Sequence, residues 1–189
     1  GAMKILRSVT QQFMQSSSPK VPTGFQQIAR VKVGGQMFMP ILYWLLIALV
    51  LYIVSKKTVF GRHVFAVGSN EKTSRLSGIN VNRVKLGVYA LMGAVVAIAA
   101  VLQVSRIGAM DPANAGSGYE LDSIAAVIVG GTSMSGGKGS VVGTVFGMLI
   151  IAVMNNLLNL LGVPPFLREA FKGAIIIAAV LLQRKSSDN

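Results

Sequence analysis

The chain has 189 residues, of which 52% are hydrophobic and 13% are charged, with a formal net charge of +12 and no cysteine. A soluble domain carries roughly a quarter of its residues as charged side chains, so this composition favours an integral membrane protein over a soluble nucleic-acid-binding protein. The lack of cysteine excludes disulfides and thiolate metal sites.

The first 36 residues are mixed in character. Residues 1–2 precede a methionine and are expected to be the remnant of a cleaved expression tag. Residues 3–14 have the apolar spacing of an amphipathic helix. Serine, proline and glycine then predict a loop at the membrane surface over residues 16–36, which completes an N-terminal region of residues 3–36.

Apolar stretches predict spanning helices in residues 37–185, with residues 186–189 as a tail. Three stretches have about the length that crosses ~30 Å of hydrocarbon at ~1.5 Å per residue, and a shorter one follows a Pro-Pro turn: 37–55, 86–104, 141–161 and 171–183. Residues 121–129 are too short to cross and run into the glycine-rich stretch 130–139. The expected fold is therefore an all-α, multi-span helical bundle with a broken or re-entrant segment.

Basic residues give these spans an orientation. Seven cations and one acid, Glu71, lie between residues 56 and 85, so the positive-inside rule places this loop in the cytoplasm. Alternation then places residues 105–120 outside and returns the chain to the cytoplasm at Arg184 and Lys185.

Within this basic loop, residues 70–77 are expected to form a short helix. Asn70 is a favourable N-cap, Glu71 lies in the first turn, and Glu71 and Arg75 are spaced i,i+4. Gly78 can take the left-handed conformation that ends a helix. So short a helix is marginal in water and needs the membrane segments or a partner to hold it.

Small and polar residues recur on the predicted span 141–161. The spacing of Gly139, Gly143 and Gly147 places three glycines on one helix face, which is typical of close helix packing and also suits a translocation path. Asn155, Asn156 and Asn159 lie toward the outer half of the span. Their amides either bond to another helix or line a polar path.

No catalytic constellation is expected. The pair Gly137-Lys138 lacks the first glycine and the final Ser/Thr of a phosphate-binding loop, because position 132 is threonine and position 139 is glycine. The single histidine, His63, has no cluster of acids near it in sequence. We therefore expect no enzymatic activity, no metal site, no cofactor and no nucleic-acid partner.

Several segments together resemble the permease subunits of bacterial ABC importers for ribose, xylose, galactose and related sugars. They occur in the order of that family: GRHVFAVGSNE (61–71), RLSGINV (75–81), GYELDSIAA (118–126), GGTS (130–133), GGKG (136–139) and NNLLNLLGV (155–163). The resemblance implies the C-terminal half of a multi-pass permease in the bacterial inner membrane. Its implied partners are cytoplasmic ATPase subunits, an extracytoplasmic sugar-binding protein, a second permease copy and membrane lipid.

The same resemblance implies a role for the basic loop. The family's equivalent of residues 69–81 is the coupling element that contacts the ATPase, which suggests Asn70, Glu71, Arg75, Leu76, Gly78 and Ile79 as contact or bracing residues. Lys72-Thr73 replaces the two alanines of the broader importer motif. Two alternatives stay open: a permease for nucleosides or branched-chain amino acids, and a short non-transporting membrane protein that binds an ATPase or anionic lipid through this loop.

Overall fold

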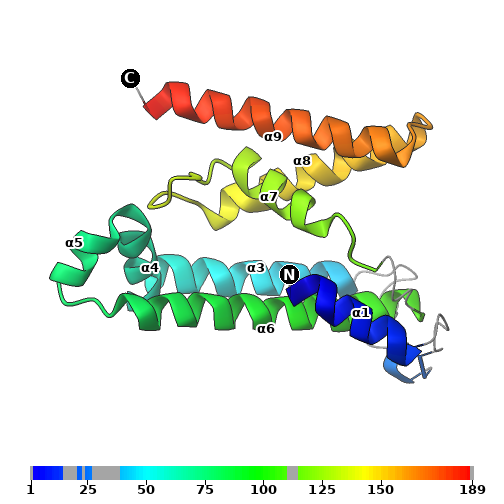
Figure 1. Cartoon of the computed structure of the whole chain (residues 1–189), viewed down its shortest axis with the longest axis horizontal. Helices are drawn as coiled ribbons and strands as arrows, with labels where there is room; N and C mark the ends of the chain where they lie inside the picture. The colour runs from blue at the N-terminus through cyan, green and yellow to red at the C-terminus, as the bar shows by residue number, and fades with distance from the viewer. Residues whose placement is uncertain (1, 15–20, 23, 27–38, 110–114, 188–189) are drawn as a thin grey trace. The chain divides into compact units, whose positions relative to one another are not determined.

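The structure is a computed structural model that describes the chain except residues 1, 15–20, 23, 27–38, 110–114 and 188–189. Its described part is helical and contains no strand. The helices are α1 (Ala2–Met14), α3 (Met39–Lys57), α4 (Val59–Ser69), α5 (Glu71–Leu76), α6 (Val81–Ile107), α7 (Tyr119–Val129), α8 (Val141–Leu160) and α9 (Pro165–Ser187) (Figure 1). The all-α prediction is confirmed for this part of the chain.

Three helices are long and apolar enough to cross a membrane: α3, α6 and α8. They correspond to the predicted spans 37–55, 86–104 and 141–161. Many of their large apolar side chains are exposed, including Leu46 at 61% and Val153 at 67%. Lipid explains such exposure, because a soluble protein rarely leaves so much apolar surface uncovered.

Two helices begin before the apolar stretches predicted within them. Helix α6 begins at Val81, five residues before the expected start, because Asn80 accepts a hydrogen bond from the Arg83 amide (3.1 Å) and caps a polar first turn. Helix α9 begins at Pro165 rather than at residue 171, since proline is tolerated in the first helical turn. Within the described residues, α9 has the length of a membrane span, at 23 residues, but it is not among the helices that are both long and apolar enough to cross.

The chain divides into two compact units, and the first comprises residues 1–47 and 89–117. The amphipathic helix expected over residues 3–14 is present as α1, whereas most of the loop expected over 16–36 lies outside the described residues. Arg7 donates a hydrogen bond to the Ala115 carbonyl (3.0 Å), and the buried Ser105 hydroxyl donates to the Phe25 carbonyl (2.8 Å).

The second unit comprises residues 48–88 and 118–189 and contains α4, α5, α7, α8 and α9. Helix α7 packs against both α8 and α9. The centre of this contact is small and apolar, formed by the buried Ala125, Ala126 and Ile151. The prediction that residues 121–129 are too short to span is confirmed, because α7 has 11 residues and ends in the glycine-rich stretch.

Candidate functional site

Helix α5 is a short helix with both ends fixed. The Asn70 side chain accepts a hydrogen bond from the Thr73 amide (3.0 Å), as expected for an N-cap. After Leu76 the chain leaves the helix through Gly78, which has a φ of +81°. The predicted cap and left-handed glycine are both confirmed, so the two ends of this helix follow from the local sequence.

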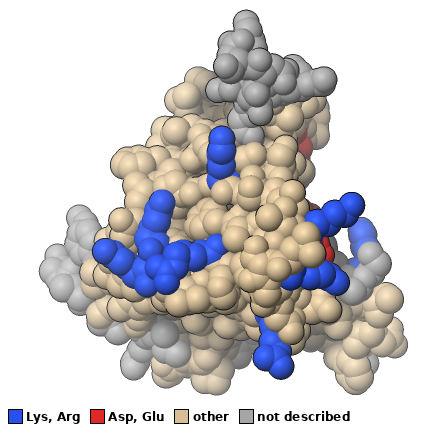
Figure 2. All heavy atoms as spheres, turned by 90° about the vertical axis from the view of Figure 1, so that its left-hand side faces the viewer, with Lys and Arg blue, Asp and Glu red and all other residues tan. Residues whose placement is uncertain are grey.

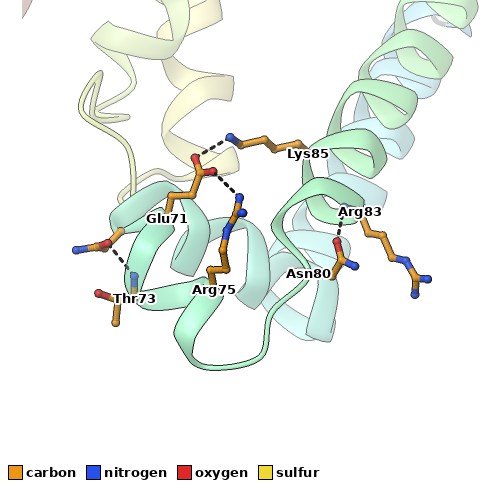
Figure 3. A network of polar contacts seen from close by, with 7 residues as sticks. Glu71, Thr73, Arg75, Asn80, Arg83 and Lys85 are labelled. Carbon is orange, nitrogen blue, oxygen red and sulfur yellow. Dashed lines mark hydrogen bonds and ion pairs between the residues drawn. The ribbon is translucent and has the colours of Figure 1, made fainter.

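Glu71 ties α5 to the first turns of α6. Its carboxylate lies 2.6 Å from the Lys85 ammonium and 3.4 Å from the Arg75 guanidinium (Figure 3). The hydrogen bond from Lys85 is the main cause that lowers the pKa of Glu71, and the charges of Lys85 and Arg75 act in the same direction. The Arg75 pair follows the predicted i,i+4 spacing, whereas Lys85 is 14 residues away and was not predicted as a partner.

The two faces of α5 differ in exposure. Only 5% of the Ser74 surface is exposed, whereas 89% of the Leu76 surface is exposed. Ile79, which follows the left-handed turn, is half-buried. An apolar side chain that projects so fully from a charged helix is available to a partner, which is the placement that a coupling contact requires.

The three predicted glycines face α7 and the turn that follows it. A Cβ on Gly147 would overlap the Ala126 carbonyl, and a Cβ on Gly143 would overlap the Gly130 carbonyl. Gly139 lies against the Thr132 side chain, where an added Cβ would come within 3.0 Å of the threonine methyl group. The glycine face is therefore a close helix contact in this chain.

The glycine-rich stretch also contacts the end of α4, directly before α5. A Cβ on Gly136 would overlap the Gly68 carbonyl, and a Cβ on Gly137 would lie 2.8 Å from the Ser69 Cα and Cβ atoms. Gly136 and Gly137 both have positive φ angles, of +86° and +73°. Because Gly136 and Gly137 have no side chain, the segment between α7 and α8 packs closely against Gly68 and Ser69, which directly precede the Asn70 cap of α5.

The three predicted asparagines do not share one environment. Asn155 is half-buried, and its amide oxygen has no hydrogen-bond partner among the described residues. Asn156 and Asn159 are exposed. The i,i+4 pair Asn155 and Asn159 is thus divided between the interior and the surface, and its role stays a prediction.

One ionic cluster was missed by the sequence reasoning. Lys172 of α9 lies 2.7 Å from Asp122 of α7 and 3.1 Å from Glu169 of its own helix. Lys172 is buried at 7% exposure, and Asp122 is half-buried in the first turn of α7, where the helix dipole also favours a carboxylate. The signal was present: a lone lysine inside the predicted apolar span 171–183 requires a partner.

Comparison with known proteins relates these features to a family. The family model described as "Branched-chain amino acid transport system / permease component" matches residues 3–180. The ribose import permease protein RbsC of Bacillus subtilis is 47% identical over 164 residues, which are 87% of this chain and 50% of that protein. RbsC of Escherichia coli (strain K12) is 41% identical over 189 residues, covering 97% of this chain and 58% of the relative.

A third relative, the xylose transport system permease protein XylH of Haemophilus influenzae, is 46% identical over 141 residues, covering 75% of this chain and 37% of its own length. The chain therefore spans about half the length of the ribose permeases that it matches. No solved structure matches it.

Proposed function

We propose that this chain, which belongs to the family of permease components of branched-chain amino acid transport systems, forms part of the membrane permease of an ATP-driven sugar importer. The chain contributes three apolar helices that are long enough to cross the bilayer. The substrate is a monosaccharide such as ribose, because the relatives compared above are named for ribose and xylose. A nucleoside or a branched-chain amino acid is the competing substrate class.

The single observation that carries the proposal is helix α5, which is exposed and has a defined end on each side, the Asn70 cap and the Gly78 turn. ATP hydrolysis takes place in a separate cytoplasmic ATPase, and α5 carries the movement of that ATPase into the membrane helices. Its Leu76 supplies an apolar contact for the partner. Glu71 and Lys85 connect α5 to the start of α6, so a force on the short helix acts on a spanning helix directly.

A complete importer also needs a path through the membrane and a source of sugar. In this proposal, two permease copies form the path in the inner membrane, and an extracytoplasmic binding protein delivers the sugar. Gly143 and Gly147 allow α8 to lie close to α7, and the half-buried Asn155 offers a polar group at the same helix. Surrounding lipid covers the exposed apolar faces of the spanning helices.

The proposal is tested by reconstituting the complete permease with its ATPase and binding protein in proteoliposomes. We expect ribose or a related pentose to stimulate ATP hydrolysis and to accumulate in the lumen. Nucleosides and branched-chain amino acids serve as the competing arms of the same assay. Uptake of a member of either competing class without pentose uptake would assign a different substrate, and no ATP-dependent uptake at all would refute the importer.

Two substitutions test the role of α5 in that assay. Leu76→Asp places a charge in the expected docking contact, and Gly78→Val forces a β-branched residue into the left-handed region. We expect each to reduce transport and ATPase association at normal expression, while the apolar control Leu76→Met stays close to the parent. Wild-type transport by both variants would show that α5 does not couple.

A further inference from the structure

A depression lies beside the exit of α5, in the second unit. Its volume is about 460 Å³ and it opens to solvent. Three elements line it: Phe60 and His63 of α4, residues 77–80 of the turn after α5, and Arg83 and Val84 of α6. Because Leu76 directly precedes this turn, a partner that covers Leu76 reaches the rim of the depression as well.

The walls of the depression are held in place by packing and capping. Phe60 lies against the backbone of α6 at Gly87, where an added Cβ would come within 2.8 Å of the phenyl ring. Val84 is buried, with 8% of its surface exposed, and supplies an apolar wall. Asn80 fixes the first turn of α6 through the Arg83 amide, so the position of the Arg83 Cα is set by the cap.

Electrostatically, the depression lacks a negative charge. Within residues 48–88 the only carboxylate is Glu71, and it is already paired with Lys85 and Arg75. The Arg83 side chain points away from these pairs (Figure 3) and forms no ion pair with any described residue. Lys and Arg side chains are prominent on this side of the molecule, where α4 and α5 lie (Figure 2).

We propose that this depression is a second docking point for the ATPase, which inserts an acidic side chain beside an apolar one. The carboxylate pairs with the Arg83 guanidinium, and the apolar neighbour covers Phe60 and Val84. This inference rests on the proposed function, because it assumes that an ATPase covers α5. The depression then adds a charge-specific contact to the apolar contact made by Leu76, so the two together define the orientation of the partner.

The matched pair Arg83→Glu and Arg62→Glu tests the inference. Both residues are exposed and both substitutions change the charge equally, but Arg62 does not line the depression. The Kd for the purified cognate ATPase is measured with the complete permease in nanodiscs of uncharged lipid. We expect Arg83→Glu to weaken binding about tenfold or more, as loss of a close interfacial charge pair does, and Arg62→Glu to weaken it less than about threefold.

A second variant covers the case in which Arg83→Glu fails to fold. Ser77→Trp fills the depression from its exposed rim and is expected to weaken binding to a similar degree. Monodisperse elution of each variant establishes that it is folded. Equal effects of Arg83→Glu and Arg62→Glu, or tight binding by Ser77→Trp, would overturn the docking point.

Failure of this inference is separable from failure of the proposed function. If Leu76→Asp abolishes ATPase binding while Arg83→Glu and Ser77→Trp bind normally, α5 couples and the depression does not dock the partner. If none of the three weakens binding, the coupling role of α5 fails too. If Arg83→Glu lowers binding only in nanodiscs with anionic lipid, the occupant is a phospholipid headgroup and the proposal is wrong.

Discussion

Lys172→Met removes the cation that joins α9 to α7. In the parent chain the Lys172 ammonium lies 2.7 Å from the Asp122 carboxylate, and the two side chains are exposed at only 8% and 20%. The substitution keeps a long, flexible side chain of similar shape, so the main loss is charge. Asp122 is then left without its counter-ion at a position largely shielded from solvent, which is the physical cause of the expected destabilisation.

The magnitude follows from the distance and the burial. At 2.7 Å and an effective dielectric constant of about 20, the gross attraction between the two charges is about 6 kcal/mol. Desolvation of both ions, at several kcal/mol each, offsets most of this in the intact pair. Removal of one partner leaves the other ion buried and uncompensated, so we expect the free energy of unfolding to fall by about 3–5 kcal/mol.

A double-mutant cycle in detergent micelles measures this effect. The free energies of unfolding of Lys172→Met, Asp122→Leu and the double variant are compared with that of the parent by denaturant titration. The double variant is expected to recover at least half of the loss, because no buried charge is then left unpaired. Lys138→Met, at an exposed lysine of the glycine-rich stretch, is the matched control and should change stability by less than about 0.5 kcal/mol. A loss below about 1 kcal/mol for Lys172→Met, or simple additivity in the cycle, would refute the reasoning.

Three further predictions test other parts of the chain. Gly147→Ala should destabilise the chain by about 1–3 kcal/mol, because the added Cβ would overlap α7. The control Gly93→Ala has open space around its Cβ and should stabilise the chain by about 0.5–1 kcal/mol. Equal effects of the two substitutions in thermal unfolding would contradict the packing of α8 against α7. The hydrogen bond that Glu71 accepts from Lys85 lowers the pKa of Glu71. The stabilisation of α5 by the Glu71 carboxylate should therefore be complete above about pH 4.3 and be lost as the pH falls through the lowered pKa. Amide exchange in α5 should become faster over this pH range, and Glu71→Gln should remove the pH dependence. In intact cells, a membrane-impermeant maleimide should label Ser117→Cys but not Ser69→Cys, and the reverse pattern would contradict the cytoplasmic assignment of α5.

Features that depend on neighbouring residues were predictable from the sequence. The Asn70 cap, the Glu71–Arg75 spacing and the left-handed Gly78 involve residues within eight positions of one another, and each is present in the structure. The apolar spans were predictable for a related reason, since the bilayer requires a continuous run of uncharged residues. The start of α6 was missed because its polar first turn depends on the cap at Asn80 rather than on hydropathy.

Contacts between distant segments required the tertiary structure. The sequence shows a lysine in an apolar stretch, but only the packing of α9 against α7 identifies Asp122 as the partner of Lys172. Likewise, glycine spacing indicates a smooth helix face, and only the structure identifies Ala126 and Gly130 as the groups that approach it. Capping and helical periodicity act over one or two turns, whereas a buried charge or a close backbone contact is satisfied by whichever segment the fold brings near, and chain order does not specify that segment.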